Sequence, residues 1–566
     1  MGSVGWIREP GTNRPGISGH RAVNARLGRR RHAPAQKTER RRQPSWRARV
    51  GGLATLLLVA GAPAQADPVQ VEQGRRIYQE GVLTDGAALR ATGAGGIDLI
   101  GAKAACIACH RRSGMGSREG SVLISPVTGT VLFNKPVPYW PSRPGRATQK
   151  VAPLRQFARD AYDAATLARA IRSGVDPNGR PLDALMPRYT LNKADAGALT
   201  AYLQQLSVAP PPGLSAGTLH LATIVASDAD PLRAKVVAET LTTWSRSGAL
   251  GGIPLHLQVW RLTGPPSTWN EQLERFNREQ PVYAVLSGAG SAQWAPVRDF
   301  CERVKLPCLF PVVDLGVSAP TDFYTLYFST GVPLEARILA RTIDELLPRP
   351  THVVQIVADE AGEAGAAGLT ERLRNVISET RRWRDDAPAD LIGDLKADDV
   401  LVGWLGQEQL RRLAESRPQG PGTDRILFSG QLGPPGKADL PLPWRQAARW
   451  VSVRSDPRRV QGRGVMGLVP WLAHMKLSAH DESLLSEVYA ATYFFGDALA
   501  RMRGNWNREF LLETLESANY ARPAGSAFFA LSLAAGQREA AKAGQLLGFE
   551  GPDFRRVVPI GPRIAP

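Results

Sequence analysis

The spacing of apolar positions along the chain changes near residue 217. Before this point, apolar side chains recur every three or four residues, as in Ala165, Leu167, Ala168 and Ile171, which is the spacing of one helical face. After it, short apolar runs alternate with longer amphipathic stretches. Such alternation is typical of parallel β-sheets that are covered by helices. The sequence therefore predicts a helical region followed by an α/β region.

The first region is expected to extend from residue 67 to residue 207. A stretch rich in glycine, proline and serine, 111–148, predicts loops with short strands, and residues 174–179 predict a turn. Residues 208–217 include three consecutive prolines and predict a stiff linker between two domains. Helices are predicted over 73–81, 162–172 and 193–206.

Residues 218–566 contain the alternating pattern, and this length suffices for two α/β lobes. No glycine-rich phosphate-binding pattern opens a predicted helix, so nucleotide binding is not expected. Strands are predicted over 219–226, 256–262, 282–286, 308–313, 353–358, 400–405 and 426–429. Helices are predicted over 232–244, 269–278, 292–304, 334–347, 368–378 and 487–501.

The net charge of +18 at pH 7 is unevenly distributed. Residues 1–66 hold 13 Lys and Arg but only 2 Asp and Glu, so the rest of the chain carries +7. Nucleic-acid binding is therefore not expected. A mildly basic protein can still favour acidic protein partners, because complementary charge speeds their encounter.

Residues 40–66 have the pattern of an export signal. A run of arginines is followed by the short apolar stretch 51–61 and by the small-residue cleavage site Ala64-Gln65-Ala66. The mature chain is expected to begin near Asp67, in the periplasm. The apolar stretch is too short to span a bilayer comfortably, and an uncleaved membrane anchor is the alternative. Residues 1 to about 38 are either an N-terminal extension or the product of a misplaced start codon.

The pentapeptide Cys106-Ile107-Ala108-Cys109-His110 has the spacing of a c-type haem attachment site. Each thiol would form a thioether with the porphyrin, and the histidine would bind the iron. A redox dithiol would need a thioredoxin-like context, and a zinc site would need a second ligand pair. Residues 67–217 contain no further cysteine or histidine. One covalent haem c is therefore the predicted cofactor.

The second axial ligand of the iron follows by elimination. His110 is the only histidine of the first region, and its methionines are Met115 and Met186. Met115 is too close to His110 in sequence to reach the opposite face of the porphyrin. Met186 is therefore the predicted ligand, beside a backbone that Pro187 restricts, and core packing is its alternative role. A thioether ligand favours a comparatively high redox potential of the haem. Because it would also fill the sixth coordination position of the iron, it favours electron transfer over oxygen chemistry.

Residues 67–207 resemble the monohaem cytochrome c family. The resemblance rests on the pentapeptide, on Met186-Pro187-Arg188-Tyr189, and on Ala201-Tyr202-Leu203 in the last predicted helix. It implies a small all-α fold around a haem with one exposed edge.

Residues from about 219 to 549 resemble periplasmic substrate-binding proteins of the branched-chain amino-acid type. The resemblance implies two lobes, a hinge, and a ligand held in the cleft between the lobes. It rests on GGIPL at 251–255, LSGAGS at 286–291, LPCLFP at 306–311 and the predicted helix 487–501.

Ser287 and Ser291 are the candidate ligand contacts, because a strand end and a helix N-terminus present hydroxyls and free N–H groups to an anion. An N-cap role is the alternative for Ser291. The family tends to offer a small residue and a hydroxyl after the next strand, where this chain has Val313 and Asp314. An acid at this position would repel a ligand carboxylate, which argues against an amino-acid ligand.

Cys301 and Cys308 are the only cysteines outside the pentapeptide. A close pair in an exported protein predicts a structural disulfide, and buried free thiols are the alternative.

Together these features predict a periplasmic electron-transfer protein and not an enzyme. Its partners would be a donor dehydrogenase and an acceptor cytochrome or oxidase, and resemblance to similar fusions suggests quinoprotein alcohol oxidation. The binding-like domain would dock a partner or sense a solute. The alternative is a solute receptor of the ABC-transporter type whose haem reports or tunes ligand binding.

Overall fold

The computed structural model describes residues 67–119, 122–135, 159–248, 253–346, 352–374, 376–437, 439–454, 467–478, 481–517, 528–529 and 531–565. The predicted export signal at 40–66 and part of the predicted loop 111–148 lie outside these ranges. Within them, no helix combines the length and the apolar character needed to cross a membrane.

The region that carries the pentapeptide is built on two long helices that contact each other. Helix α1 (Pro68–Glu80) begins where the Asp67 side chain accepts a hydrogen bond from the Val69 N–H, and it ends at Gly81 in a left-handed conformation. Helix α5 (Lys193–Gln205) is capped by Asn192. The two helices approach so closely that a Cβ at Gly74 would lie 2.0 Å from the Ala198 carbonyl oxygen. Between them in sequence lie α2 (Ile107–His110), α3 (Gly129–Leu132) and α4 (Ala164–Ser173).

This region is not all-α, and the prediction on this point was wrong. Strands β2 (Asp98–Ile100), β1 (Arg90–Thr92) and β5 (Arg188–Thr190) form an antiparallel sheet in that order. A hairpin of β3 (Ser117–Glu119) and β4 (Val122–Ile124) lies apart from it. These strands have only three residues each, too few for an alternating pattern to show in the sequence.

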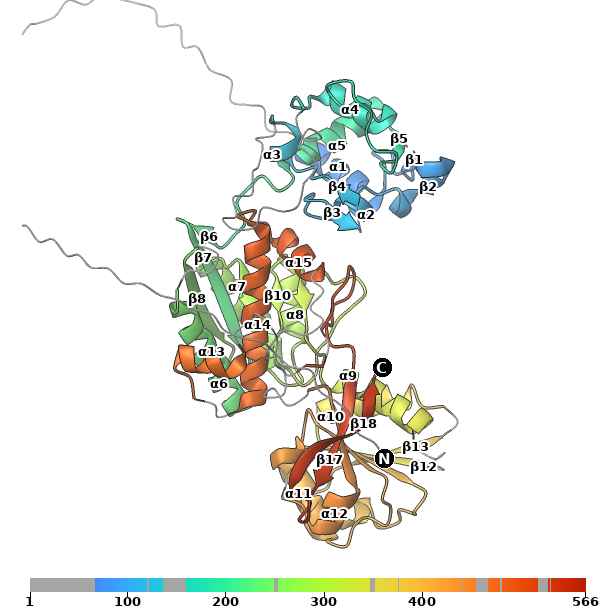
Figure 1. Cartoon of the computed structure of the whole chain (residues 1–566), viewed down its shortest axis with the longest axis vertical. Helices are drawn as coiled ribbons and strands as arrows, with labels where there is room; N and C mark the ends of the chain where they lie inside the picture. The colour runs from blue at the N-terminus through green and yellow to red at the C-terminus, as the bar shows by residue number, and fades with distance from the viewer. Residues whose placement is uncertain are drawn as a thin grey trace, which may run out of the picture. The chain divides into compact units, whose positions relative to one another are not determined.

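The first α/β lobe contains a mainly parallel sheet in the order β11-β10-β9-β7-β6, with β8 beside β7. Helices α6 and α14 cover one face, and α7 and α8 cover the other (Figure 1). The strands are β6 (Leu214–Ser215), β7 (Thr218–Val225), β8 (Leu255–Arg261), β9 (Ala284–Leu286), β10 (Cys308–Leu309) and β11 (Thr325–Leu326). The helices are α6 (Pro231–Arg246), α7 (Trp269–Glu279), α8 (Ala295–Arg303), α13 (Leu468–Met475), α14 (Glu482–Met502) and α15 (Arg508–Glu516).

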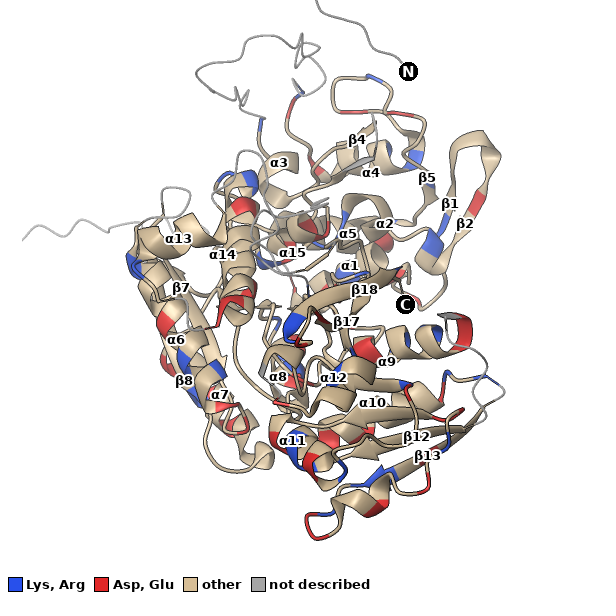
Figure 2. Ribbon diagram, turned by 60° about the horizontal axis from the view of Figure 1, so that its bottom comes forward, with Lys and Arg blue, Asp and Glu red and all other residues tan. Residues whose placement is uncertain are grey.

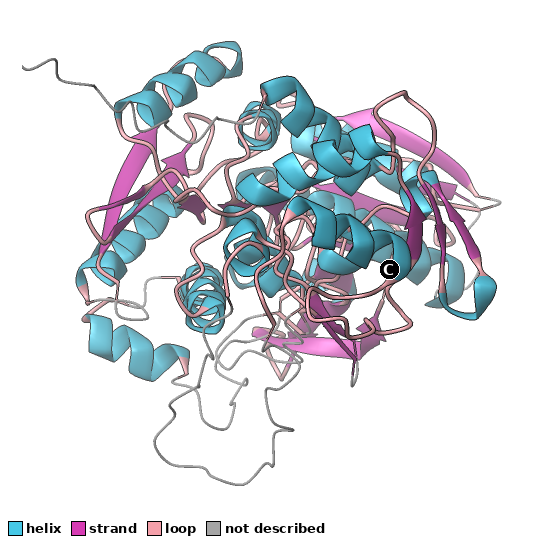
Figure 3. Cartoon of the chain, turned by 90° about the horizontal axis from the view of Figure 1, so that it is seen from above, coloured by secondary structure: helices cyan, strands magenta, loops and turns pink. Residues whose placement is uncertain are grey.

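The second lobe contains a seven-stranded sheet in the order β13-β12-β14-β15-β16-β17-β18. Helices α9 and α10 pack on one face of this sheet, and α11 and α12 pack on the other. Figure 3 shows helices lying beside strands. The strands are β12 (His352–Val357), β13 (Ile377–Arg382), β14 (Val400–Trp404), β15 (Ile426–Ser429), β16 (Ala448–Ser452), β17 (Gly544–Glu550) and β18 (Arg556–Ile564). The helices are α9 (Val332–Arg341), α10 (Glu360–Thr370), α11 (Gln407–Ser416) and α12 (Leu442–Ala447).

Most predicted elements of the α/β region are present, with shifted ends, but the helix predicted over 368–378 was wrong. The Asp359 side chain accepts a hydrogen bond from the Gly362 N–H, so α10 begins earlier and ends at Thr370. Ile377 then opens β13, which pairs in parallel with β12 from His352 onward. The predicted linker 208–217 also contributes β6, which pairs with β7.

Charges of both signs alternate on the outer helices α7 and α11 (Figure 2). On α11, the Arg411 guanidinium contacts the carboxylates of Glu408 and Glu415, one turn away on either side. Such pairs balance charge locally, so these two helices present no surface of a single sign.

Candidate haem site and inter-lobe polar cluster

The four residues predicted to hold a haem line one cavity of about 530 Å³. Its walls are largely apolar, and its volume falls within the range of small-molecule and cofactor sites, about 300–1,000 Å³. The predicted haem residues on these walls are Cys106, Cys109, His110 and Met186. The structure thus brings together residues that are separated by up to 80 positions in the sequence.

Helix α2 explains how the pentapeptide presents its side chains. Cys106 precedes this single helical turn, and hydrogen bonds from the N–H groups of Cys109 and His110 return to its carbonyl oxygen, at 3.3 and 2.9 Å. Residues three and four positions apart lie on one helical face, so both thiols and the imidazole can face the same cavity. Arg111 then adopts φ 66°, which ends the helix. Burial raises the pKa of the Cys106 thiol to about 12.

The His110 imidazole is held by a backbone carbonyl. Its Nδ1 atom lies 2.9 Å from the Ser125 carbonyl oxygen, which can only accept a hydrogen bond. Nδ1 must therefore carry a proton, which leaves Nε2 with a lone pair when the ring is neutral. Burial lowers the pKa of His110 and favours this neutral form, and the Ser125 contact opposes the shift only partly. A metal-binding histidine needs this arrangement.

Met186 reaches the cavity from the loop between α4 and β5. Its N–H bonds to the Asp183 carbonyl oxygen at 3.1 Å, and its own carbonyl oxygen accepts a hydrogen bond from the Arg188 guanidinium. Met115 is not among the residues that line the cavity; its N–H bonds to Ser113 Oγ at 3.1 Å. The residues present fit a covalent haem: two thiols, one imidazole with a free lone pair and one thioether share an apolar cavity.

Sequence reasoning did not single out Ser125, and it named Arg188 only within the motif Met186-Pro187-Arg188-Tyr189, without a role as a support of Met186. Ser125 acts through its backbone carbonyl, a group that every residue carries. Arg188, the first residue of β5, donates to the backbone carbonyl of a residue two positions away, a role that its residue type does not signal.

The two serines predicted to contact a ligand differ in their surroundings. Ser287 lies just after β9 with φ 54° and is 1% exposed, and its Oγ has no hydrogen-bond partner among the described residues. Ser291 Oγ donates to Asp314 Oδ2 at 2.9 Å. Ser291 is thus engaged with the acid that was expected to repel a ligand carboxylate.

Asp314 is neutralised by an arginine that the sequence analysis did not single out. The Arg233 guanidinium donates to both carboxylate oxygens of Asp314, at 2.7 and 2.9 Å, and to the Gly290 carbonyl oxygen at 2.6 Å. Burial by itself would raise the pKa of Asp314, but the Arg233 charge and the hydrogen bonds outweigh it, so the pKa is lowered. Asp314 is therefore ionised and paired.

Polar contacts continue from Asp314 into the second lobe. Gln431, just after β15, donates from Nε2 to Asp314 Oδ1 at 2.7 Å, and its N–H bonds to Glu335 Oε1 of α9 at 2.9 Å. Ser429 Oγ donates to the other Glu335 oxygen at 2.5 Å. Burial raises the pKa of Glu335 to about 8, although these hydrogen bonds oppose the shift. We call Arg233, Ser291, Asp314, Glu335, Ser429 and Gln431 the inter-lobe cluster.

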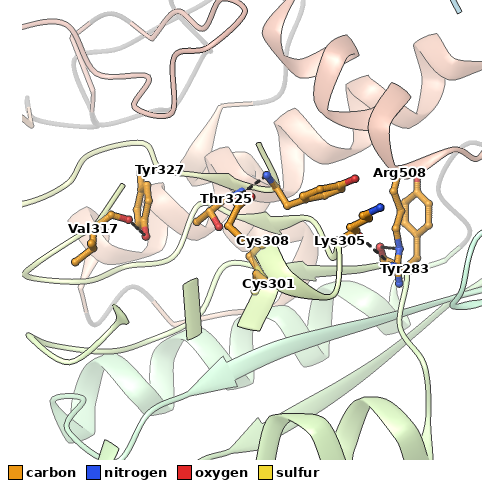
Figure 4. The surroundings of a disulfide bond; sticks show 10 residues. Tyr283, Cys301, Lys305, Cys308, Val317, Thr325, Tyr327 and Arg508 are labelled. Carbon is orange, nitrogen blue, oxygen red and sulfur yellow. Dashed lines mark hydrogen bonds between the residues drawn. A yellow bond between two sulfur atoms is a disulfide. The ribbon is translucent and has the colours of Figure 1, made fainter. Parts of the chain in front are cut away.

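The predicted disulfide is confirmed: Cys301 of α8 and Cys308 of β10 are bonded (Figure 4). Their Cα atoms are 6.2 Å apart, and both residues are buried beneath the sheet of the first lobe.

Residues 98–207 match the family model described as Cytochrome c. No curated protein matches the chain. A leucine-binding protein from Thermotoga maritima is 13% identical with a TM-score of 0.47, over 62% of this chain and 99% of that chain. A putative branched-chain amino acid ABC transporter protein from Rhodospirillum rubrum is 17% identical with a TM-score of 0.45, over 60% and 99%. A solute-binding protein of an ABC transporter from Rhodopseudomonas palustris, in complex with benzoate, is 14% identical with a TM-score of 0.46, over 62% and 98%.

Residues 98–207 therefore carry a cytochrome c domain. A cytochrome c domain implies a covalently bound haem c and a function in electron transfer.

Proposed function

We propose that this protein is an exported electron carrier with one covalent haem c, whose iron is bound by His110 and Met186. The observation that carries the proposal is the single apolar cavity lined by both thiols, the imidazole and the thioether. When bound, the haem supplies reversible one-electron exchange at its iron.

The protein's own residues would anchor, orient and shield the cofactor. The thiols of Cys106 and Cys109 would form the thioether links. The Ser125 carbonyl oxygen binds the Nδ1 side of the His110 ring, which leaves the Nε2 lone pair available for the iron. If both His110 and Met186 bound the iron, they would leave no iron position for a substrate, so the protein is proposed to be a carrier and not an enzyme.

Export to the periplasm is supported by the Cys301–Cys308 disulfide, because such bonds form and persist in oxidising compartments. In that compartment the protein would accept electrons from a dehydrogenase, of the quinoprotein type by the resemblance noted above. It would pass them to an acceptor cytochrome or oxidase. The two-lobed part would dock one of these partners or sense a solute.

A second candidate function is a solute receptor whose haem reports or tunes binding. It is favoured by two buried polar atoms that lack partners among the described residues, Ser287 Oγ and Gln431 Oε1. Unpaired buried groups are costly, and a polar ligand could satisfy them. Arg233 and Asp314, in contrast, neutralise each other, so neither charge is left for a charged ligand to pair with.

The test is an optical redox titration of the haem-loaded full chain, with added imidazole and carbon monoxide as probes of an open iron position. We expect a one-electron Nernst curve and no binding of either probe to the unmodified protein. Binding of a probe would overturn the carrier function. A thermal-shift screen with amino acids, carboxylates, alcohols and aldehydes addresses the second candidate, since a ligand at 100 times its dissociation constant adds about 2.7 kcal/mol of stability.

A further inference from the structure

Residues 111–116, which follow His110 and which we call the haem segment, are held by helix α15. The Ser113 N–H donates to Glu513 Oε1 at 2.9 Å, and its hydroxyl donates to the other oxygen of the same carboxylate. The Arg111 guanidinium donates to Glu516 Oε2 at 2.6 Å. Glu513 and Glu516 both belong to α15, about 400 residues away in sequence. We call Arg111, Ser113, Glu513 and Glu516 the α15 clamp.

The residues of the α15 clamp are largely buried, so losing these contacts would be costly. Ser113 is 1% exposed, and both glutamates are 5% exposed. A carboxylate that is removed from water is costly unless charges or hydrogen bonds compensate for it. Glu516 is shared between Arg111 and the buried Arg538. A displacement of the haem segment would leave these carboxylates unpaired, so the clamp favours a single position of that segment.

Further contacts fix the same segment from both sides. Ser207 Oγ donates to the Ser113 carbonyl oxygen at 2.6 Å, and Asn507 Nδ2 donates to Ser207 Oγ at 3.0 Å. The Arg112 guanidinium lies 4.3 Å from the centre of the Phe323 ring. The haem segment is therefore linked through Ser207 to the start of α15, and it contacts the loop that precedes β11.

The clamp is close to His110 along the chain. The Gly116 N–H bonds to the His110 carbonyl oxygen at 3.1 Å, and the Met115 N–H bonds to Ser113 Oγ at 3.1 Å. The Tyr78 hydroxyl donates to the Arg111 carbonyl oxygen at 2.7 Å. These short links connect Ser113 to His110 through a tight turn.

Helix α15 is itself anchored in the first lobe. Arg508, its first residue, donates to the carbonyl oxygens of Tyr283 and Lys305, at 3.1 and 3.0 Å (Figure 4). The clamp thus transmits constraints from the sheet of this lobe to the haem segment.

The contacts also continue to the connection between the lobes. Arg538, which binds Glu516, donates to the Phe323 carbonyl oxygen at 2.7 Å. The next residue, Glu539, accepts from the N–H and hydroxyl of Thr330, at 2.8 and 2.6 Å. Thr330 lies between β11 and α9, where the chain passes from the first lobe to the second.

We propose that Glu513 and Glu516 are positioning residues for the haem, through which the two-lobed part of the chain sets the haem's redox potential. This rests on the proposed function, because it requires a haem bound at Cys106, Cys109 and His110. Two physical effects act together. The carboxylates orient the residues that directly follow His110. Negative charge on them would favour the oxidised, more positive iron. Burial raises the pKa of Glu513 to about 7, so the potentials are compared at pH 8, above this value.

The test compares Glu513→Gln and Glu516→Gln with Glu509→Gln in the haem-loaded full chain. Glu509 is a matched control: it lies on the same helix but accepts a hydrogen bond from Tyr324, not from the haem segment. We expect midpoint potentials more positive than that of the parent for Glu513→Gln and Glu516→Gln, and an unchanged potential for Glu509→Gln. Thermal stability is measured in parallel, since a merely structural role would lower stability without moving the potential.

Ser113→Ala is the second variant should the glutamate variants fail to fold. It removes the hydroxyl's hydrogen bonds to Glu513 and to the Met115 N–H, and it retains the carboxylate. Potentials equal to the parent's in Ser113→Ala and in every folded glutamate variant would overturn the proposal. Failure of the proposed function would look different: the parent protein itself would lack a covalently attached haem or would bind imidazole at its iron.

Discussion

The Nδ1 atom of His110 and the carbonyl oxygen of Ser125 lie 2.9 Å apart, and this contact fixes which nitrogen of the ring is free. Because a carbonyl accepts but never donates, the free nitrogen is Nε2. The backbone near β4 thus prepares the histidine of the pentapeptide for metal binding, while Met186 reaches the same cavity from a distant loop.

Met186→Ala is expected to lower the midpoint potential of the haem. A thioether stabilises ferrous iron, and axial ligands spread haem potentials over about 0.8 V, so a drop on the order of 0.1 V is expected. Spectroelectrochemistry of the purified protein measures it. Met115→Ala is the control, since that side chain does not line the cavity, and an equal drop in both variants would argue against Met186 as the ligand.

Replacing Cys301 and Cys308 together by serine is expected to destabilise the first lobe by about 2–3 kcal/mol. The two residues are seven positions apart, and closing so short a loop restricts the unfolded chain modestly in the chain-entropy model. Urea denaturation followed by tryptophan fluorescence measures the change. The disulfide belongs to a different hydrophobic cluster from the residues that line the haem cavity, so the haem spectrum should stay the same.

Breaking the Arg233–Asp314 pair from one side should cost more than removing both charges. The side chains are 16% and 10% exposed, so Arg233→Met or Asp314→Leu leaves a buried charge without its partner, at a cost of about 3–5 kcal/mol. The double variant Arg233→Met/Asp314→Leu should lose clearly less than the sum of the single losses. A double-mutant cycle in denaturant provides the measurement, and strict additivity would show that the pair is not coupled.

Glu335 should make the stability of the protein depend on pH. Burial raises its pKa to about 8 in the folded state, whereas an unfolded glutamate has a pKa of about 4.3. Between these values the folded protein retains a proton that the unfolded chain has released. The free energy of unfolding should therefore fall by a few kcal/mol as the pH rises from about 4 to 8, at about 1.4 kcal/mol per pKa unit.

Glu335→Gln should remove most of this dependence. An amide can still accept from the Gln431 N–H and can donate to Ser429 Oγ, so the local contacts persist. Denaturant unfolding from pH 5 to pH 9 compares this variant with Glu408→Gln, whose side chain on α11 is 63% exposed. A parent protein with the same pH profile as Glu335→Gln would show that Glu335 is ionised throughout.

Local patterns in the sequence determined the predicted haem ligands, most helices and strands of the lobes, and the disulfide. The pentapeptide spacing placed two thiols and an imidazole on one helical turn, and the scarcity of histidine and methionine left Met186 as the second axial candidate. Alternating apolar runs predicted most strands and helices of the two lobes. The close spacing of Cys301 and Cys308 predicted the disulfide that the structure contains. All these signals lie within short windows, where geometry follows directly from sequence spacing.

Only the tertiary structure decided which distant residues meet. Asp314 was expected to repel a ligand, but Arg233 neutralises it from 81 positions away. Glu513 and Glu516 reach the haem segment across about 400 residues. The three-residue strands β1, β2 and β5 acquire their conformation by pairing with one another. No local pattern marks such partners, because a charge or a short strand is compatible with many neighbours until the packing of the whole chain selects one.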